Sequence, residues 1–179
     1  MTKNILVINC GSSSIKFKLL RAETSGLSAR FAGLLDHLGE ARASLSTRRF
    51  DANSGSEQRM LGPVPEHAAG MHIVLDALRD VGMLEQGLDA IGHRVVHGGE
   101  HFSAPTRIDA AVLTALRAIA PLAPLHNPAG LLGIEACQAA FPDLPQVAVF
   151  DTAFHQTLPP AAYRYAVPVD WYRQYGVRR

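Results

Sequence analysis

Apolar and polar residues alternate along the first fifty positions with the period of half-buried β-strands. Residues 15–19 show this most clearly, because they read Ile, Lys, Phe, Lys and Leu. Residues 51–57 are rich in turn formers and are predicted to form a loop. The pattern before this loop predicts four consecutive strands, at residues 4–10, 15–21, 27–36 and 42–50.

Beyond the loop, the spacing of apolar residues becomes helical, with two short apolar strands at residues 90–96 and 146–150. Helices are predicted at residues 66–80, 108–120 and 127–141. The first of them carries its apolar residues on one face, at Met71, Val74, Leu75, Leu78 and Val81.

The third helix is expected to begin with Asn127 as its N-cap and Pro128 in its first turn. A run of strands followed by alternating helices and strands predicts an α/β fold, with a mixed sheet flanked by helices. No linker, repeat or low-complexity tract divides the sequence, so residues 1–179 are expected to form a single domain.

Composition narrows the class of protein. The chain has 179 residues, 47% of them apolar, which is enough for a sizeable core. A formal net charge of +1 gives no electrostatic reason to expect nucleic acid or an anionic membrane as a partner. No apolar run approaches the roughly 20 residues of a membrane span, and no signal peptide is visible, so a cytoplasmic protein is expected. Cys10 and Cys137 have no metal-site spacing and are expected to be reduced, packed thiols.

The most informative segment is the turn Gly11–Ser14, which connects the first two predicted strands. Glycine lets the backbone approach a ligand, and three serine hydroxyls lie beside free amide groups. Asn9 precedes the turn and Lys16 follows it, so the collection of donors suits an anion, phosphate above all. The spacing is not that of a P-loop. A Gly-Ser hairpin can also be a simple turn, and this alternative stays open.

A second segment, Gly92–Glu100, ends a predicted strand in two glycines. His93 and His97 share a face of an extended strand but lie about 13 Å apart, too far to bind one metal ion together. Arg94 lies on the opposite face, where a guanidinium can bind a carboxylate or phosphate with two parallel hydrogen bonds. Val96 could form an apolar wall beside it. The alternative is that Arg94 is a surface or ion-paired arginine.

The last polar candidates follow further apolar segments. Asp151 comes directly after the strand at 146–150, where α/β sheets present ligand-binding side chains. Its alternative is a structural carboxylate. His126 and His155 are more simply explained as hydrogen-bonded structural histidines. A serine or metal hydrolase is disfavoured, because the chain has neither a Gly-x-Ser-x-Gly elbow nor a His-Glu-x-x-His motif.

Taken in order, these segments closely resemble the acetate kinase family, which includes propionate and butyrate kinases. Tyr172 and the YGVR run that ends at Arg178 look like the start of a further block of the family. The matching blocks are NCGSSSIK at 9–16, GHRVVHGG at 92–99, PLHNP at 124–128 and VFDTAFHQ at 149–156.

The resemblance implies one half of the two-lobed fold of acid-sugar kinases, Hsp70 and actin, which is ribonuclease H-like. It implies reversible transfer of the γ-phosphoryl group of ATP to acetate, with Mg²⁺, or Mn²⁺, as the metal. It also implies a homodimer of the full-length protein. The alternatives are a propionate or butyrate kinase and a non-catalytic binding domain of kinase ancestry.

The resemblance also assigns roles to single residues. Asp151 matches the catalytic aspartate, and Asn9 takes part at the metal. Because a carboxylic acid is already ionised at neutral pH, Asp151 is expected to orient groups or bind the metal rather than act as a base. The nucleotide phosphates are assigned to Gly11, Ser12, Ser14 and Lys16. The carboxylate is assigned to Arg94, and its alkyl tail to Val96 and Leu125.

The sequence departs from the family in length, because family members continue well beyond residue 179. The C-terminal nucleotide-binding half is therefore expected to be absent from this polypeptide. A site between two lobes cannot close without both. We expect little or no kinase activity from these residues alone, and exposed apolar surface where the other half would pack.

Overall fold

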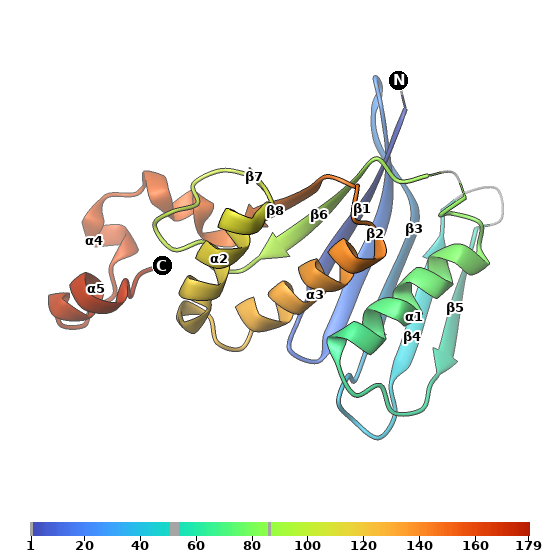
Figure 1. Cartoon of the computed structure of the whole chain (residues 1–179), viewed down its shortest axis with the longest axis horizontal. Coiled ribbons are helices and arrows are strands. Elements are labelled where there is room, and N and C mark those ends of the chain that lie inside the picture. The colour runs from blue at the N-terminus through green and yellow to red at the C-terminus, as the bar shows by residue number, and fades with distance from the viewer. Residues whose placement is uncertain (1, 51–53, 86) are drawn as a thin grey trace.

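A computed structural model describes residues 2–50, 54–85 and 87–179. This part of the chain forms one eight-stranded sheet in the order β5-β4-β3-β2-β1-β6-β8-β7 (Figure 1). The strands are β1 (Lys3–Cys10), β2 (Ser14–Glu23), β3 (Gly26–Asp36), β4 (Ser44–Arg49), β5 (Gly55–Met60), β6 (Ala90–Val95), β7 (Thr106–Arg107) and β8 (Gln146–Phe150).

The sheet is mixed, as the sequence predicts. Strands β1 to β5 form an antiparallel meander, whereas β6 lies parallel to both β1 and β8. Antiparallel neighbours can follow one another through short turns, but parallel neighbours need a crossover, and helices supply it. The carboxyl ends of β1, β6 and β8 therefore meet at one edge of the sheet, where α/β folds commonly bind ligands.

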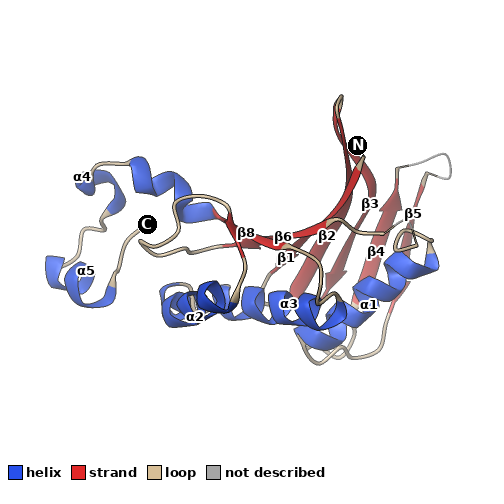
Figure 2. Cartoon of the chain, turned by 45° about the horizontal axis from the view of Figure 1, so that its top comes forward, coloured by secondary structure: helices blue, strands red, loops and turns tan. Residues whose placement is uncertain are grey.

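The long helices lie on one face of the sheet and leave the other face open (Figure 2). Helix α1 (His67–Asp80) packs against α3 (Asn127–Ala140) and against β2 and β3, and α3 packs against β1 and β6. The predicted apolar face of α1 is buried at Met71, Val74 and Leu78. The helices and 3₁₀ turns are α1 (His67–Asp80), α2 (Ala110–Ile119), η1 (Ala120–Leu122), α3 (Asn127–Ala140), η2 (Asp151–Thr157), α4 (Pro160–Tyr163) and α5 (Val169–Tyr175).

Two apolar clusters form the core. The larger lies between α1 and the strands β1 to β4, and includes Leu6, Phe31 and Leu78. The smaller lies between α2 and the strands β6 and β8, and includes Val95 and Leu116. Side chains of this size contribute about 1.5–3 kcal/mol each when fully buried. They therefore fix the sheet and its helices rigidly behind the open face.

Several details differ from the sequence prediction, among them the short helices α4 (Pro160–Tyr163) and α5 (Val169–Tyr175), which were not predicted. Part of the predicted loop forms strand β5, and residues 51–53 of that loop lie outside the described residues. Every residue of β5 is exposed, so this edge strand has no apolar alternation to reveal it. Asn127 is not the N-cap of α3, because His126 takes that position and the Asn127 side chain bonds to His97 instead. The two-residue strand β7 was also not predicted.

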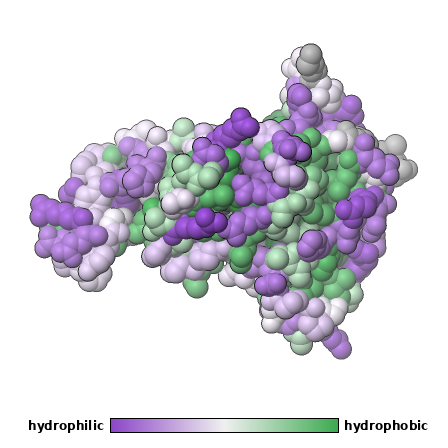
Figure 3. Space-filling view, in the orientation of Figure 1, coloured by the Kyte–Doolittle hydropathy of each residue, from purple (hydrophilic) through white to green (hydrophobic). Residues whose placement is uncertain are grey.

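After β8 the chain leaves the sheet, and beyond Thr157 it forms α4 and α5 at one end of the molecule (Figure 1). Polar residues cover much of this end in the space-filling view (Figure 3). Large side chains such as Phe154, Trp171 and Tyr175 are exposed on this segment and just before it. Arg178 anchors it, since its side chain is only 4% exposed and pairs with Glu100 at 2.8 Å. No helix in the described ranges is long and apolar enough to cross a membrane.

Candidate functional site

Arg94, Asp151 and Asn9 meet at the carboxyl ends of three neighbouring strands. Nε of Arg94 donates to Oδ1 and Oδ2 of Asp151 at 2.9 and 3.1 Å, and Nη2 donates to Oδ2 at 2.6 Å. Nη1 donates to Oδ1 of Asn9 at 3.2 Å. The sheet order β1-β6-β8 explains the meeting, because each strand delivers one of the three side chains to the same edge.

The alternation of β6 places Arg94 on the open face of the sheet, while His93 is buried on the other face, as predicted. The side chains of Arg94 and Asp151 are 48% and 41% exposed. Hydrogen bonding to Asp151 raises the pKa of the guanidinium, against the opposing effect of partial burial. An ion pair this exposed contributes about 0–1 kcal/mol to stability, so the fold does not depend on it.

Lys16 lies one strand further along the same face. It is exposed on β2 and pairs in register with Asn9 of β1. Its neighbours Ile15 and Phe17 point to the opposite face and are buried. A hollow of about 350 Å³ begins at this pair of residues, lined by Val7, Asn9, Lys16, Phe17, Lys18, Ala32, Gly33 and Leu34. The lysine and arginine predicted to bind different substrates thus share one surface, with Asn9 between them.

The turn Gly11–Ser14 is fixed by bonds to its carbonyl groups. The Gly11 N–H donates to the Ser14 carbonyl at 2.8 Å, and the Leu38 N–H donates to the Ser13 carbonyl at 2.9 Å. Nε2 of His67 lies 2.6 Å from the Gly11 carbonyl. Ser12 is exposed and Ser14 begins β2, half-buried. The predicted phosphate turn is therefore at the surface, next to the strands that carry Asn9 and Lys16.

His67 was missed by the sequence interpretation, although a signal for it exists. It has the same helical phase as Met71, Val74 and Leu78, so it lies on the buried face of α1. A polar residue on the apolar face of a helix needs a hydrogen-bond partner. That phase could have identified His67 as a residue with a specific contact, but not the partner.

Val96 and Leu125, the residues assigned to the alkyl tail, lie in two loops that hydrogen bonds between Asn127 and His97 hold together. Oδ1 of Asn127 accepts a hydrogen bond from the His97 N–H at 3.1 Å, and its Nδ2 donates to the His97 carbonyl at 2.9 Å. These bonds hold the loop after Val96 beside the loop after Leu125. Val96 is half-buried, whereas Leu125 is 71% exposed. Their role at a substrate tail stays a prediction.

The histidines of the second segment have protein partners. Nε2 of His93 bonds to Oε1 of the buried Gln146 at 2.8 Å, and burial lowers the pKa of His93 to about 4. Nδ1 of His97 accepts from the Gly99 N–H at 2.9 Å, so its Nε2 carries the proton that is donated to the Arg178 carbonyl at 3.1 Å. Both rings therefore serve as structural links in this chain.

The residues at the edge of the sheet offer few metal ligands. In the described ranges, no three His, Cys, Asp or Glu side chains form a cluster that could hold an ion. The oxygen donors available are the amide of Asn9 and the carboxylate of Asp151, joined through Arg94. One carboxylate with a neutral oxygen suits Mg²⁺, which keeps several waters and takes further ligands from substrate phosphates. The donor set fits such an ion and does not suit a cage made by the protein alone.

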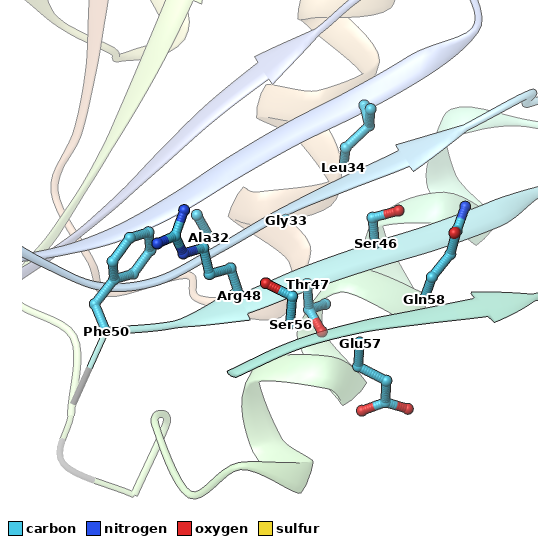
Figure 4. Close-up of a pocket in the computed structure, with 10 residues that line it drawn as sticks. All are labelled: Ala32, Gly33, Leu34, Ser46, Thr47, Arg48, Phe50, Ser56, Glu57 and Gln58. Carbon is cyan, nitrogen blue, oxygen red and sulfur yellow. The ribbon is translucent and has the colours of Figure 1, made fainter. Parts of the chain in front are cut away.

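A second hollow of about 480 Å³ lies on the open face over β3, β4 and β5. Figure 4 shows its lining side chains, with the Phe50 ring beside Arg48. The Arg48 guanidinium lies 5.0 Å from the centre of that ring. None of the predicted site residues lines this hollow. It shares Ala32, Gly33 and Leu34 with the hollow at Lys16, so the two adjoin.

Comparisons with known proteins identify relatives of this chain. The chain is 53% identical to the acetate kinase of Deinococcus deserti over 176 residues, which are 97% of the chain and 42% of that protein. It is 51% identical to the acetate kinase of Deinococcus radiodurans over 174 residues, again 97% and 42%. The chain thus spans about 42% of the length of these relatives.

Solved structures give the same result. A propionate kinase from Francisella tularensis matches with a TM-score of 0.86 and 40% identity, covering 99% of this chain and 44% of that one. The acetate kinase of Porphyromonas gingivalis matches with a TM-score of 0.85 and 40% identity, again over 99% and 44%. The mixed α/β fold of this chain is therefore that of the matched portion of these kinases.

The family model described as the Acetokinase family matches residues 4–179. This match spans the four sequence blocks at 9–16, 92–99, 124–128 and 149–156, and it confirms the family resemblance found in the sequence. The chain belongs to the acetokinase family.

Proposed function

We propose that this chain provides the carboxylate-binding and phosphate-binding surface of an acetate kinase, which transfers the γ-phosphoryl group of ATP reversibly to acetate. The observation that carries the proposal is the position of Arg94. Its guanidinium lies between Asn9 and Asp151, on the same face as Lys16. Two cations with different geometries therefore lie on one surface, a planar fork for a carboxylate and a point charge for phosphate.

The chemistry needs alignment more than proton transfer. Acetate is ionised at neutral pH, so its oxygen attacks phosphorus without a general base. The obstacle is the repulsion between an anionic nucleophile and an anionic phosphoryl group, which positive groups in a fixed geometry reduce. Arg94 would hold the acetate oxygens, and Lys16 with the turn at Gly11–Ser14 would hold the phosphates. Each group acts by binding and neutralising charge.

Asp151 and Asn9 complete this surface. We propose that they orient Arg94 and contribute oxygen ligands to a divalent cation bound with ATP. When bound, the cation, Mg²⁺ or Mn²⁺, would neutralise phosphate charge. The contact between Arg94 and Asp151 fixes the plane of the guanidinium through three hydrogen bonds. These bonds hold the guanidinium in place before acetate binds, and acetate then competes with Asp151 for the same N–H groups.

Longer carboxylates are the second candidate substrates. The match to a propionate kinase structure favours a propionate-using alternative, and butyrate is the next member of the same series. The half-buried Val96 and the exposed Leu125 are the residues proposed to contact the alkyl tail. The homodimer and the cytoplasmic location stay predictions. So does the organisation of residues 1–179 as one domain.

Titration with acetate by calorimetry tests the carboxylate site. Arg94→Ala is expected to abolish acetate binding, and Arg94→Lys to weaken it about tenfold or more, because a lysine keeps the charge but loses the fork. Arg117→Ala is a matched control, since Arg117 is an exposed arginine paired with Glu135. Unchanged acetate binding by Arg94→Ala would contradict the assignment.

The reaction itself is tested in a full-length protein that contains these residues, because residues 1–179 alone are expected to have little or no kinase activity. Acyl phosphate is trapped with hydroxylamine in the presence of ATP and Mg²⁺, and acetate, propionate and butyrate are compared. Ester hydrolysis is measured in parallel to detect hydrolase activity. Acyl hydroxamate formed in an ATP-dependent way supports the kinase. Carboxylate binding without any acyl phosphate would favour the non-catalytic alternative.

A further inference from the structure

His67 forms a contact that the packing of its own helix does not require. It is the first residue of α1, its surface is 8% exposed, and its Nε2 lies 2.6 Å from the carbonyl oxygen of Gly11. A ring nitrogen that faces a carbonyl oxygen at this distance must carry a proton, so His67 is the donor. Burying an imidazole is unfavourable unless it is hydrogen-bonded, and the Gly11 carbonyl meets that need.

The helix is held in place by other contacts. Gly70 lies so close to β2 and β3 that an added Cβ would be 2.9 Å from Cδ1 of Ile15 and 3.1 Å from Cδ2 of Leu35. Met71, Val74 and Leu78 then bury the apolar face of α1. An apolar side chain at position 67 would extend that face without interruption. The histidine is therefore explained by the turn it contacts rather than by the packing of α1.

The bond belongs to a set that orients the turn. The carbonyls of Gly11, Ser13 and Ser14 accept hydrogen bonds from His67, Leu38 and Gly11 respectively. Ser12 and Ser13 are exposed, and their N–H groups have no hydrogen-bond acceptor among the residues that the structure describes. Fixed carbonyls with open N–H groups are the arrangement in which a turn binds an anion.

We propose that His67 is a positioning residue for the phosphate turn: its Nε2–H fixes the Gly11 carbonyl and thereby keeps the Ser12 and Ser13 N–H groups directed at a phosphate. This inference rests on the proposed function and adds a residue that does not touch substrate. If the Gly11 carbonyl were released, the peptide could rotate toward the surface and place a negative oxygen beside the phosphate. The turn would then repel the anion it is meant to bind.

The test uses inorganic tripolyphosphate with Mg²⁺ as the probe, and measures Kd by calorimetry for the whole chain. His67→Leu removes the donor and is expected to weaken binding about fivefold to tenfold, the equivalent of one hydrogen bond. His67→Gln places an amide N–H the same number of bonds from Cα and is expected to stay within about twofold of the original chain. His72→Leu is the matched control, because His72 is an exposed histidine on the same helix.

Two further measurements separate positioning from general damage. Acetate affinity is expected to be unchanged in every variant, since Arg94 lies on β6 and not in the turn that His67 contacts. The Gly11 and Leu38 N–H groups donate to the Ser14 and Ser13 carbonyls, and their exchange with solvent is expected to accelerate in His67→Leu but not in His67→Gln. If His67→Leu does not fold, His67→Met serves instead, because it is unbranched, fills the space and has no donor.

The outcomes are distinct. Equal tripolyphosphate binding by the original chain and His67→Leu overturns the inference and leaves the proposed function intact. Equal losses in His67→Leu and His67→Gln also overturn it, since the donor would then not matter. If the original chain binds acetate but no tripolyphosphate, the proposed phosphate site is wrong and the inference falls with it.

Discussion

Arg94 directs its guanidinium at the carboxylate of Asp151, and the two side chains share three hydrogen bonds of 2.6 to 3.1 Å. This is the geometry in which an arginine binds a carboxylate substrate. A bound acetate and Asp151 therefore compete for the same N–H groups. Acetate binding at Arg94 is therefore coupled to the charge of Asp151, the proposed catalytic carboxylate.

Asp151→Asn is expected to tighten acetate binding. The substitution removes a negative charge beside the site and leaves an amide that accepts more weakly from Arg94. The expected gain is about threefold to tenfold in Kd, or roughly 1 kcal/mol, as for other half-exposed charge pairs. Calorimetric titration with acetate measures it.

Asp143→Asn provides the control for this measurement. Asp143 is an exposed carboxylate before the start of β8, whereas Asp151 follows the end of that strand. The control loses the same charge at a distance from Arg94 and is expected to bind acetate as the original chain does. Weaker acetate binding by Asp151→Asn would show that Asp151 helps Arg94 to bind acetate rather than competing with acetate for its N–H groups.

The sequence predicted most of the fold because most elements have one buried face. Strand β2 alternates between buried and exposed positions from Ile15 to Leu19, and helix α1 repeats its apolar residues with helical period. Strand β5 has no buried face and was therefore invisible to the pattern. The short helices α4 and α5 bury no residue of their own and left no signal either.

The candidate site was predictable in composition but not in its contacts. Asn9, Arg94 and Asp151 each follow or end an apolar strand, so their place at the edge of the sheet could be inferred. That Arg94 would bind Asp151 depends on the parallel pairing of β6 with β8, which the sequence does not reveal. Asn127 was misread because its amide bonds to the His97 backbone 30 residues away, and that non-local contact replaced the local cap.

Acidification is expected to loosen the segment that contains α5. The Tyr172 hydroxyl and the Arg178 guanidinium both bond to Glu100, and these contacts lower the pKa of that carboxyl. A group whose pKa is depressed by folding stabilises fully above its ordinary pKa, and this contribution is lost as pH falls through the lower folded value. The loosening of α5 on protonation of Glu100 is therefore expected at a pH below the ordinary glutamate pKa.

Trp171 gives a direct measurement of this transition, because it is the only tryptophan of the chain and precedes Tyr172 in α5. Its emission is expected to shift as Glu100 takes up a proton. Glu100→Gln is expected to show the shifted emission already at neutral pH and no acid transition. An acid transition with the same midpoint in Glu100→Gln would assign the change to another group.

Helix α3 packs closely against β1 at Gly133, and this contact is expected to couple Gly133 to Cys10. A Cβ on Gly133 would lie closer than 3.0 Å to Sγ of Cys10, a distance that real Cβ atoms do not reach, but 3.6 Å from Cβ of Cys10. Cys10 is buried, and desolvation raises the pKa of its thiol to about 12, so the group behaves as a small neutral side chain.

Gly133→Ala is therefore expected to destabilise the fold by about 1–3 kcal/mol through overpacking. Cys10→Ala removes the sulfur that causes the clash, so the added methyl group can occupy that space. The double variant is expected to be more stable than Gly133→Ala alone, which gives a coupling energy that urea unfolding of all four chains measures. Additive effects of the two substitutions would mean that α3 shifts away from β1 instead of colliding with Cys10.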